Sequence, residues 1–278
     1  MDQISFSNLL MKSLAIFKKH WIELLGFSVV AGMILLIPIM LIGFLMVLAF
    51  TTSGSTALVM LGVGLVFLAL IFGGIFISLS ALRLTVDATK MEKISIPNAL
   101  SYGLKNGLSF MWASITGCFY AFGWVLVAIL AIPVVGVLAK RSPAVMMLLS
   151  LCGFFAAFYS MYIGVKLVFM GVAFVQDEKR GVEAAKTSIA LVTGRWWNVA
   201  LNCIFIAILG SIAVSLVTGI LDGILSHNGV VSLIRTILQA AFGVMMSIFT
   251  ILLYGAYKAP VAAAPSEAPA APTPPAAA

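Results

Sequence analysis

The residue types that usually carry chemistry are scarce in this sequence and are not spaced for it. Cys118, Cys152 and Cys203 each lie within an apolar stretch, no two of them have metal-ligand spacing, and an odd number does not fit a disulfide framework. His20 and His227 lie far apart along the chain. There is no HExxH, CxxC or GxSxG motif and no P-loop. We therefore predict no metal site, no bound cofactor and no activated nucleophile.

The nine acidic residues do not suggest a catalytic pair either. General acid and base catalysis needs carboxyl groups that converge in one cleft, whereas nearly all of these residues fall in tails, connections or helix ends. Glu23 lies near Lys19 at the start of the first apolar stretch, where a solvated ion pair explains it. We expect the protein not to be an enzyme.

Arg235 is the one charge that lies clearly within an apolar stretch. It is about 7.5 Å along a helix from Val230, at a rise of 1.5 Å per residue. Charged side chains inside a membrane are costly and often functional. The alternatives are that Arg235 extends to the outer headgroups or pairs with Asp222. Lys166 is a similar case, with extension to the headgroups as the alternative to a functional role.

Composition points to a membrane protein. Hydrophobic residues make up 63% of the 278 residues and charged residues 9%, whereas a soluble domain carries about 25% charged residues. A bilayer core needs roughly 20 apolar residues in one helix. Six stretches meet this length: 22–50, 57–84, 112–139, 144–175, 197–221 and 230–257. The expected fold is an all-α polytopic membrane protein with six transmembrane helices.

The basic residues predict the orientation. The net charge is +7, and the Lys and Arg residues fall mostly between the apolar stretches, which indicates anionic lipid headgroups rather than nucleic acid. One predicted side holds Lys140 and Arg141. The other side holds Lys12, Lys18, Lys19, Lys90, Lys93, Lys105, Lys179, Arg180, Lys186 and Arg195. The positive-inside rule therefore places both termini in the cytoplasm, and we expect a multi-pass protein of a bacterial inner membrane.

Three segments share a pattern just before an odd-numbered apolar stretch. They are SFSNLLMKSLAIFKKHW, SIPNALSYGLKNGLSFMW and GVEAAKTSIALVTGRWW, at 5–21, 95–112 and 181–197. Helical spacing predicts an apolar face on each. These faces hold Phe6, Leu9, Leu10, Leu14, Phe17 and Trp21, then Ile96, Ala99, Leu100, Leu104, Leu108 and Met111, then Val182, Ala185, Ile189, Val192 and Trp196. Each segment is expected to lie in the headgroup plane.

The six stretches thus group into three parallel units, at about 3–90, 94–176 and 178–258, within one membrane domain, 1–258. Each unit is an interfacial amphipathic helix followed by a helical hairpin. The alternative is a chance similarity between amphipathic helices. The remaining residues, 259–278, are rich in proline and alanine and are expected to form a disordered tail.

Two sets of residues are predicted to contact the membrane surface. Tryptophan side chains favour the interface, and basic side chains extend to headgroups. The predicted anchors are Trp21, Trp112, Trp196 and Trp197. The predicted headgroup contacts are Lys18, Lys19, Arg83, Lys105, Lys166, Arg180 and Arg195. Tyr162 and Lys166 are four residues apart, as are Tyr254 and Lys258.

The pattern EAAKTSIALVTGRWW followed by an apolar span resembles the membrane domain of some bacterial glycerophosphodiester phosphodiesterases. Stand-alone inner-membrane proteins share this pattern, and the resemblance covers 5–258. It implies a six-span membrane module of unsettled role. The phosphodiesterase activity of that family resides in a separate barrel domain, so no catalytic residue of the family maps onto this chain.

Two functions follow from these observations. The first is a non-enzymatic protein that organises or assembles membrane components through contacts with anionic lipids, with a protein partner or with a second copy of itself. The second is a transporter or channel for an apolar or lipid-like substrate between the three units. Arg235 and the potential kinks at Pro38 and Pro133 motivate the transporter.

Overall fold

The computed structural model describes residues 6–53, 56–90, 92, 94–139, 143–225 and 229–262. Helices account for nearly all of these residues, as predicted. In chain order they are α1 (Phe6–Ser53), α2 (Thr56–Thr89), α3 (Ile96–Ala139), α4 (Pro143–Leu167), α5 (Met170–Gln176), α6 (Val182–Val192), α7 (Trp196–Leu225) and α8 (Gly229–Ala262). The last helix extends past the predicted start of the tail, whose remainder, 263–278, lies outside the described residues.

Five helical segments within these ranges are long and apolar enough to cross a membrane. They are Phe6–Thr52, Thr56–Thr89, Leu151–Gln176, Trp196–Gly223 and Val231–Ala259. The chain is therefore compatible with a polytopic membrane protein, as predicted. The third predicted span, 112–139, belongs to α3, but most of its side chains lie outside the described part of the molecule.

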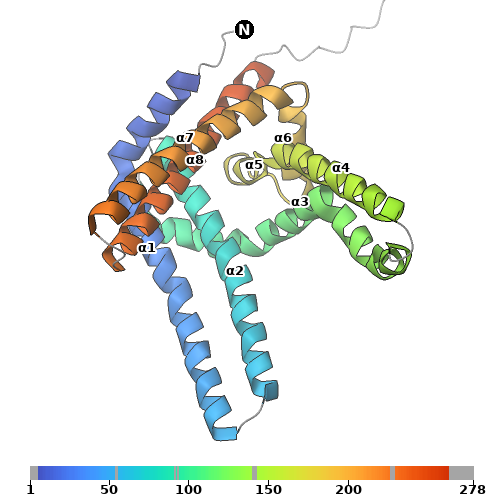
Figure 1. Ribbon diagram of the computed structural model, residues 1–278. Helices are drawn as coiled ribbons and strands as arrows, with labels where there is room; N and C mark the ends of the chain where they lie inside the picture. Colours follow the sequence, from blue (N-terminus) through green and yellow to red (C-terminus); the bar gives the residue numbers. More distant parts are fainter. Residues whose placement is uncertain are drawn as a thin grey trace, which may run out of the picture.

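The outer parts of α1 and α2 form a hairpin that extends away from the other helices, and α3 and α4 extend in a different direction (Figure 1). Apolar side chains along this first hairpin are exposed, from Met33 to Phe50 and from Leu58 to Phe72. Lipid tails are as apolar as these side chains, so their exposure carries no penalty inside a bilayer. The helical backbone of α1 continues through Pro38.

The protein core lies at the opposite end, around the short helix α5. Residues Phe169 and Val172–Val175 are at most 2% exposed. The start of α1 meets the end of α8 there, with the rings of Phe6 and Phe249 5.5 Å apart. We call this region the core end. It comprises residues 6–19 of α1, 79–89 of α2, 170–176 of α5, 182–192 of α6 and 248–258 of α8.

Two of the three predicted amphipathic segments are set off from the helix that follows. In α1 the backbone leaves helical geometry at His20 (φ −122°, ψ 20°), directly before Trp21. Helix α6 ends at Val192, and Gly194 (φ 79°) makes the turn before α7 begins at Trp196. The second segment differs, because α3 runs on through Trp112 as one helix.

The predicted apolar faces are only partly buried within the protein. In the first segment, within α1, the buried residues are Leu9, Ser13 and Ile16, while Leu14 is 56% exposed. In α3 the face against α2 is built from Ala99, Gly103 and Gly107, and the predicted Leu104 and Leu108 point outward. Small residues let helix backbones approach closely. In this protein, a hydrophobic helix face can therefore lie on the outer, lipid-facing side as well as in the core.

Candidate functional site

A break between α4 and α5 positions the centre of the core end. The predicted span 144–175 is interrupted after Leu167, which leaves the Lys166 carbonyl and the Phe169 amide without their helical partners. Ser188 of α6 satisfies both groups. Its hydroxyl donates to the Lys166 carbonyl at 2.7 Å and accepts from the Phe169 N–H at 3.1 Å. The amphipathic helix α6 is thereby attached to the broken membrane helix.

Ser188→Ala is expected to lower the free energy of unfolding by about 1–3 kcal/mol, because two buried backbone groups lose their partner. Unfolding in mixed micelles of increasing SDS content measures the change. The matched control is Thr187→Val, since the Thr187 hydroxyl bonds only within its own helix, to the Glu183 carbonyl. Equal effects of the two variants would show that Ser188 does not support the break.

Asp177, directly after α5, connects this loop to the end of α8. Its carboxylate accepts hydrogen bonds from the Tyr254 hydroxyl at 2.5 Å and from the Lys258 ammonium at 2.6 Å. The Asp177 side chain is 10% exposed, and Tyr254 is fully buried. Helix α8 is therefore tied to the α5–α6 connection by a charge-assisted network. Lys258, four residues after Tyr254, thus forms an ion pair within the protein.

Basic side chains at this end lie over aromatic rings. Cations are attracted to the faces of such rings within about 6 Å of the centroid. The pairs are Arg83 with Tyr102 at 5.2 Å, Lys166 with Tyr162 at 4.4 Å, Arg180 with Phe174 at 5.0 Å, Arg195 with Tyr257 at 5.7 Å and Lys258 with Tyr254 at 5.8 Å. Each of these cations therefore has an aromatic partner within the protein.

A polar cluster joins α2, α3 and the α5–α6 connection. Arg83 lies within ion-pair distance of Asp87, at 3.1 Å. Arg180 donates to the Asn106 side-chain oxygen at 2.7 Å. Tyr102 lies one turn before Asn106, and burial raises the pKa of its phenol above the ordinary value although Arg180 and Arg83 act in the opposite direction. The phenol therefore stays protonated at neutral pH.

The predicted headgroup residues divide into two groups. Arg83, Lys166, Arg180 and Arg195 make the contacts within the protein described above, and Arg195 also donates to the Tyr257 carbonyl at 3.2 Å. Lys18, Lys19 and Lys105 have exposed side chains. The Arg180 side chain of the first group is exposed as well.

The predicted tryptophan anchors differ in how far they are exposed. Trp21, Trp112 and Trp197 are 50%, 63% and 72% exposed. Trp196 is partly buried, and its indole N–H donates to the Tyr162 carbonyl at 3.0 Å. Trp196 therefore joins α7 to α4 as well as lying at a surface. A surface groove with a volume of ≈ 570 Å³ runs past it, lined by Phe158, Tyr159, Met161, Tyr162, Trp196 and Trp197.

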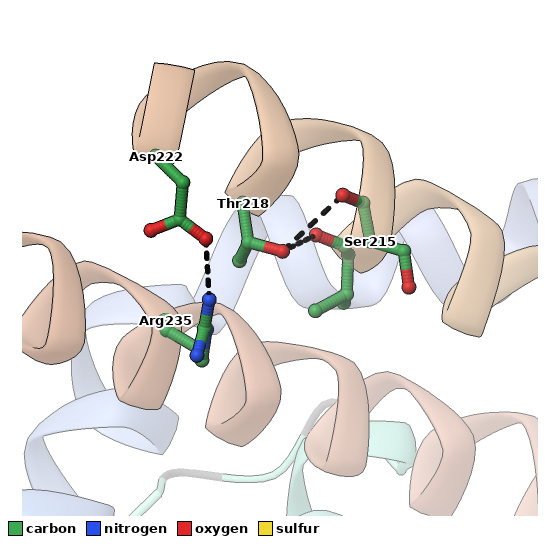
Figure 2. A network of polar contacts seen from close by, with 5 residues as sticks. Ser215, Thr218, Asp222 and Arg235 are labelled. Carbon is green, nitrogen blue, oxygen red and sulfur yellow. Dashed lines mark hydrogen bonds and ion pairs between the residues drawn. The ribbon is translucent and has the colours of Figure 1, made fainter. Parts of the chain in front are cut away.

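Arg235 pairs with Asp222 across α7 and α8, with 2.7 Å between the two charged groups. Figure 2 shows the pair beside Thr218, whose hydroxyl donates to the carbonyls of Val214 and Ser215 in its own helix. Among the alternatives predicted for Arg235, the structure shows the pairing with Asp222. An ion pair reduces the cost of a charge near lipid, so Arg235 needs no transport role to explain it.

Ser188 and Asp177 are the functional-site residues that the sequence did not reveal. Ser188 lies on the same face of α6 as Ala184 and Leu191, and a hydroxyl among small apolar residues was the available signal. Asp177 lies shortly before α6, where a negative charge suits the positive end of the helix dipole. Its partners in α8 lie 77 and 81 residues away, so no local pattern indicates them.

Within the described part of the chain, no group of three or more His, Cys, Asp or Glu side chains is arranged to hold a metal ion. Comparisons with protein-family models, with curated proteins and with solved structures found no match to this chain. The resemblance to the membrane domain of glycerophosphodiester phosphodiesterases therefore stays a prediction.

Proposed function

We propose that this chain is a non-enzymatic integral membrane protein that organises membrane components through lipid or protein contacts. In this proposal it spans a bacterial inner membrane with both termini in the cytoplasm, so that the core end faces the cytoplasmic headgroups. The observation that carries this proposal is that the apolar surface and the exposed basic residues lie on different parts of the protein. The α1–α2 hairpin exposes apolar side chains, while Lys18, Lys19 and Lys105 are exposed at or beside the core end.

The alternative is a transporter or channel for an apolar or lipid-like substrate. It requires a cavity between the hairpins. The groove beside Trp196 opens on the surface, and Arg235 is matched by Asp222. Both observations favour the first function. The resemblance to a membrane module without its own catalytic domain agrees with it.

The test replaces the three exposed lysines by glutamine, as Lys18→Gln, Lys19→Gln and Lys105→Gln together. The protein is reconstituted in vesicles with equal parts phosphatidylglycerol and phosphatidylcholine and then extracted in mild detergent, and the ratio of the two lipids that co-purify is measured. Wild type is expected to retain an excess of phosphatidylglycerol. The variant should lose most of it, since each removed charge is worth about 1 kcal/mol near an anionic surface.

The matched control carries arginine at the same three positions and is expected to keep the excess, because it keeps the charge. An unchanged lipid ratio in the glutamine variant would overturn the proposed headgroup role of these lysines.

A further inference from the structure

Two grooves meet at the start of α7. The larger is the apolar groove between α4 and α7 described above. The smaller has a volume of ≈ 280 Å³ and is lined by Gly194, Arg195, Trp196, Trp197 and Asn198. Because Trp196 and Trp197 line both, the two grooves adjoin. One continuous surface therefore passes from apolar side chains to a polar end at the α6–α7 turn.

The walls of the larger groove are held in place. The Trp196 indole uses its single N–H donor on the Tyr162 carbonyl, and the two rings lie 5.6 Å apart. Trp197 packs edge-on against Trp196, with ring centroids 4.8 Å apart. Since the indole donor of Trp196 is occupied, that ring offers an occupant only apolar surface. Phe158 lies one turn from Tyr162 and extends this wall along α4, which suits a hydrocarbon chain.

Both basic residues next to the grooves have donors to spare. Lys166 follows Tyr162 by one turn, and its ammonium, which has three N–H donors, lies over that ring. Arg195 belongs to the smaller groove itself. A guanidinium has five N–H donors, and the bond to the Tyr257 carbonyl uses one. Arginine binds phosphate through paired N–H groups, so the polar end of the surface is complementary to a phosphate.

We propose that these adjoining grooves bind one anionic phospholipid. Its acyl chain lies in the groove between α4 and α7, and its phosphate contacts Arg195 and Lys166. The inference rests on the proposed function for its membrane setting and adds a defined site to it. The site is separate from the exposed lysines at positions 18, 19 and 105.

Tryptophan fluorescence can report this site alone. Trp21→Phe, Trp112→Phe and Trp124→Phe together leave only Trp196 and Trp197 as emitters in the full chain. This parent protein is placed in nanodiscs that contain brominated phosphatidylglycerol or, separately, brominated phosphatidylcholine at the same mole fraction. Bromine quenches nearby indoles. The expected result is roughly 25-fold higher occupancy by phosphatidylglycerol, the combined effect of two basic residues near a membrane surface at about 1 kcal/mol each.

Arg195→Gln should lower this excess about fivefold, and so should Lys166→Gln. The second variant matters because Arg195 also holds Tyr257, so a loss seen with Arg195→Gln alone could come from local unfolding. Arg235→Gln is the matched control, since it removes a positive charge that is paired with Asp222 away from both grooves. Equal quenching by the two lipids in the parent protein, or an excess that Lys166→Gln leaves unchanged, would overturn the site.

The glutamine variant of Lys18, Lys19 and Lys105 separates the two proposals. If it loses the co-purified phosphatidylglycerol but keeps the excess quenching at Trp196 and Trp197, the groove site stands by itself. If the excess quenching disappears with those lysines, recognition belongs to the general basic surface and the groove proposal is wrong. Excess quenching without any lipid enrichment by wild type would instead contradict the proposed function and leave the groove supported.

Discussion

Gly103→Ala is expected to destabilise the folded protein by about 1–3 kcal/mol, the usual cost of an added methyl in a closely packed contact. A Cβ atom at Gly103 would lie 2.8 Å from the Phe76 carbonyl oxygen of α2 and would overlap the Ser80 hydroxyl. The carbonyl belongs to the helix backbone, so α2 and α3 must move apart to admit the methyl. The same displacement would separate Arg83 from the Tyr102 ring.

Gly123→Ala is the matched control within the same helix. A Cβ atom there meets no other atom within 4 Å, and alanine favours a helix over glycine by roughly 1 kcal/mol. This variant should therefore be neutral or slightly more stable. Unfolding by SDS in mixed micelles, followed by tryptophan fluorescence, compares the two. Similar stability of both variants would mean that α2 and α3 do not approach closely at Gly103.

Asp177→Asn is expected to lower the free energy of unfolding by about 2 kcal/mol, in the range for hydrogen bonds to charged groups. The buried Tyr254 hydroxyl loses its anionic acceptor, and the ion pair with Lys258 is lost as well. Most of the effect should come from Tyr254, because the Lys258 side chain is 46% exposed and exposed ion pairs contribute little. The same micelle titration measures the change.

Two variants test whether most of the stabilisation comes from Tyr254 and little from Lys258. Glu178→Gln removes one negative charge from the neighbouring exposed residue and should change stability by less than about 0.5 kcal/mol. Lys258→Met removes the ion pair but leaves the bond between Tyr254 and Asp177, so its cost should be well below that of Asp177→Asn. A cost for Lys258→Met as large as that for Asp177→Asn would contradict the leading role of Tyr254.

The class of protein could be predicted from the sequence because it depends on local properties. About 20 consecutive apolar residues are enough to form a helix that is stable in lipid, whatever the rest of the chain does. The predicted stretches at 22–50, 57–84, 197–221 and 230–257 accordingly fall within long helices. Trp21 and Trp196 lie directly after a bend or a turn of the backbone.

The parts that the sequence could not supply depend on contacts between distant segments. Lipid and protein interior are both apolar, so periodicity could not tell that Leu104 faces outward while Gly103 meets α2. The break after Leu167 is sustained by Ser188, a partner from another helix. Local sequence determined which segments become apolar helices. Which faces meet, and which partner each buried polar group finds, was decided by tertiary packing, because those energies arise only when remote residues come together.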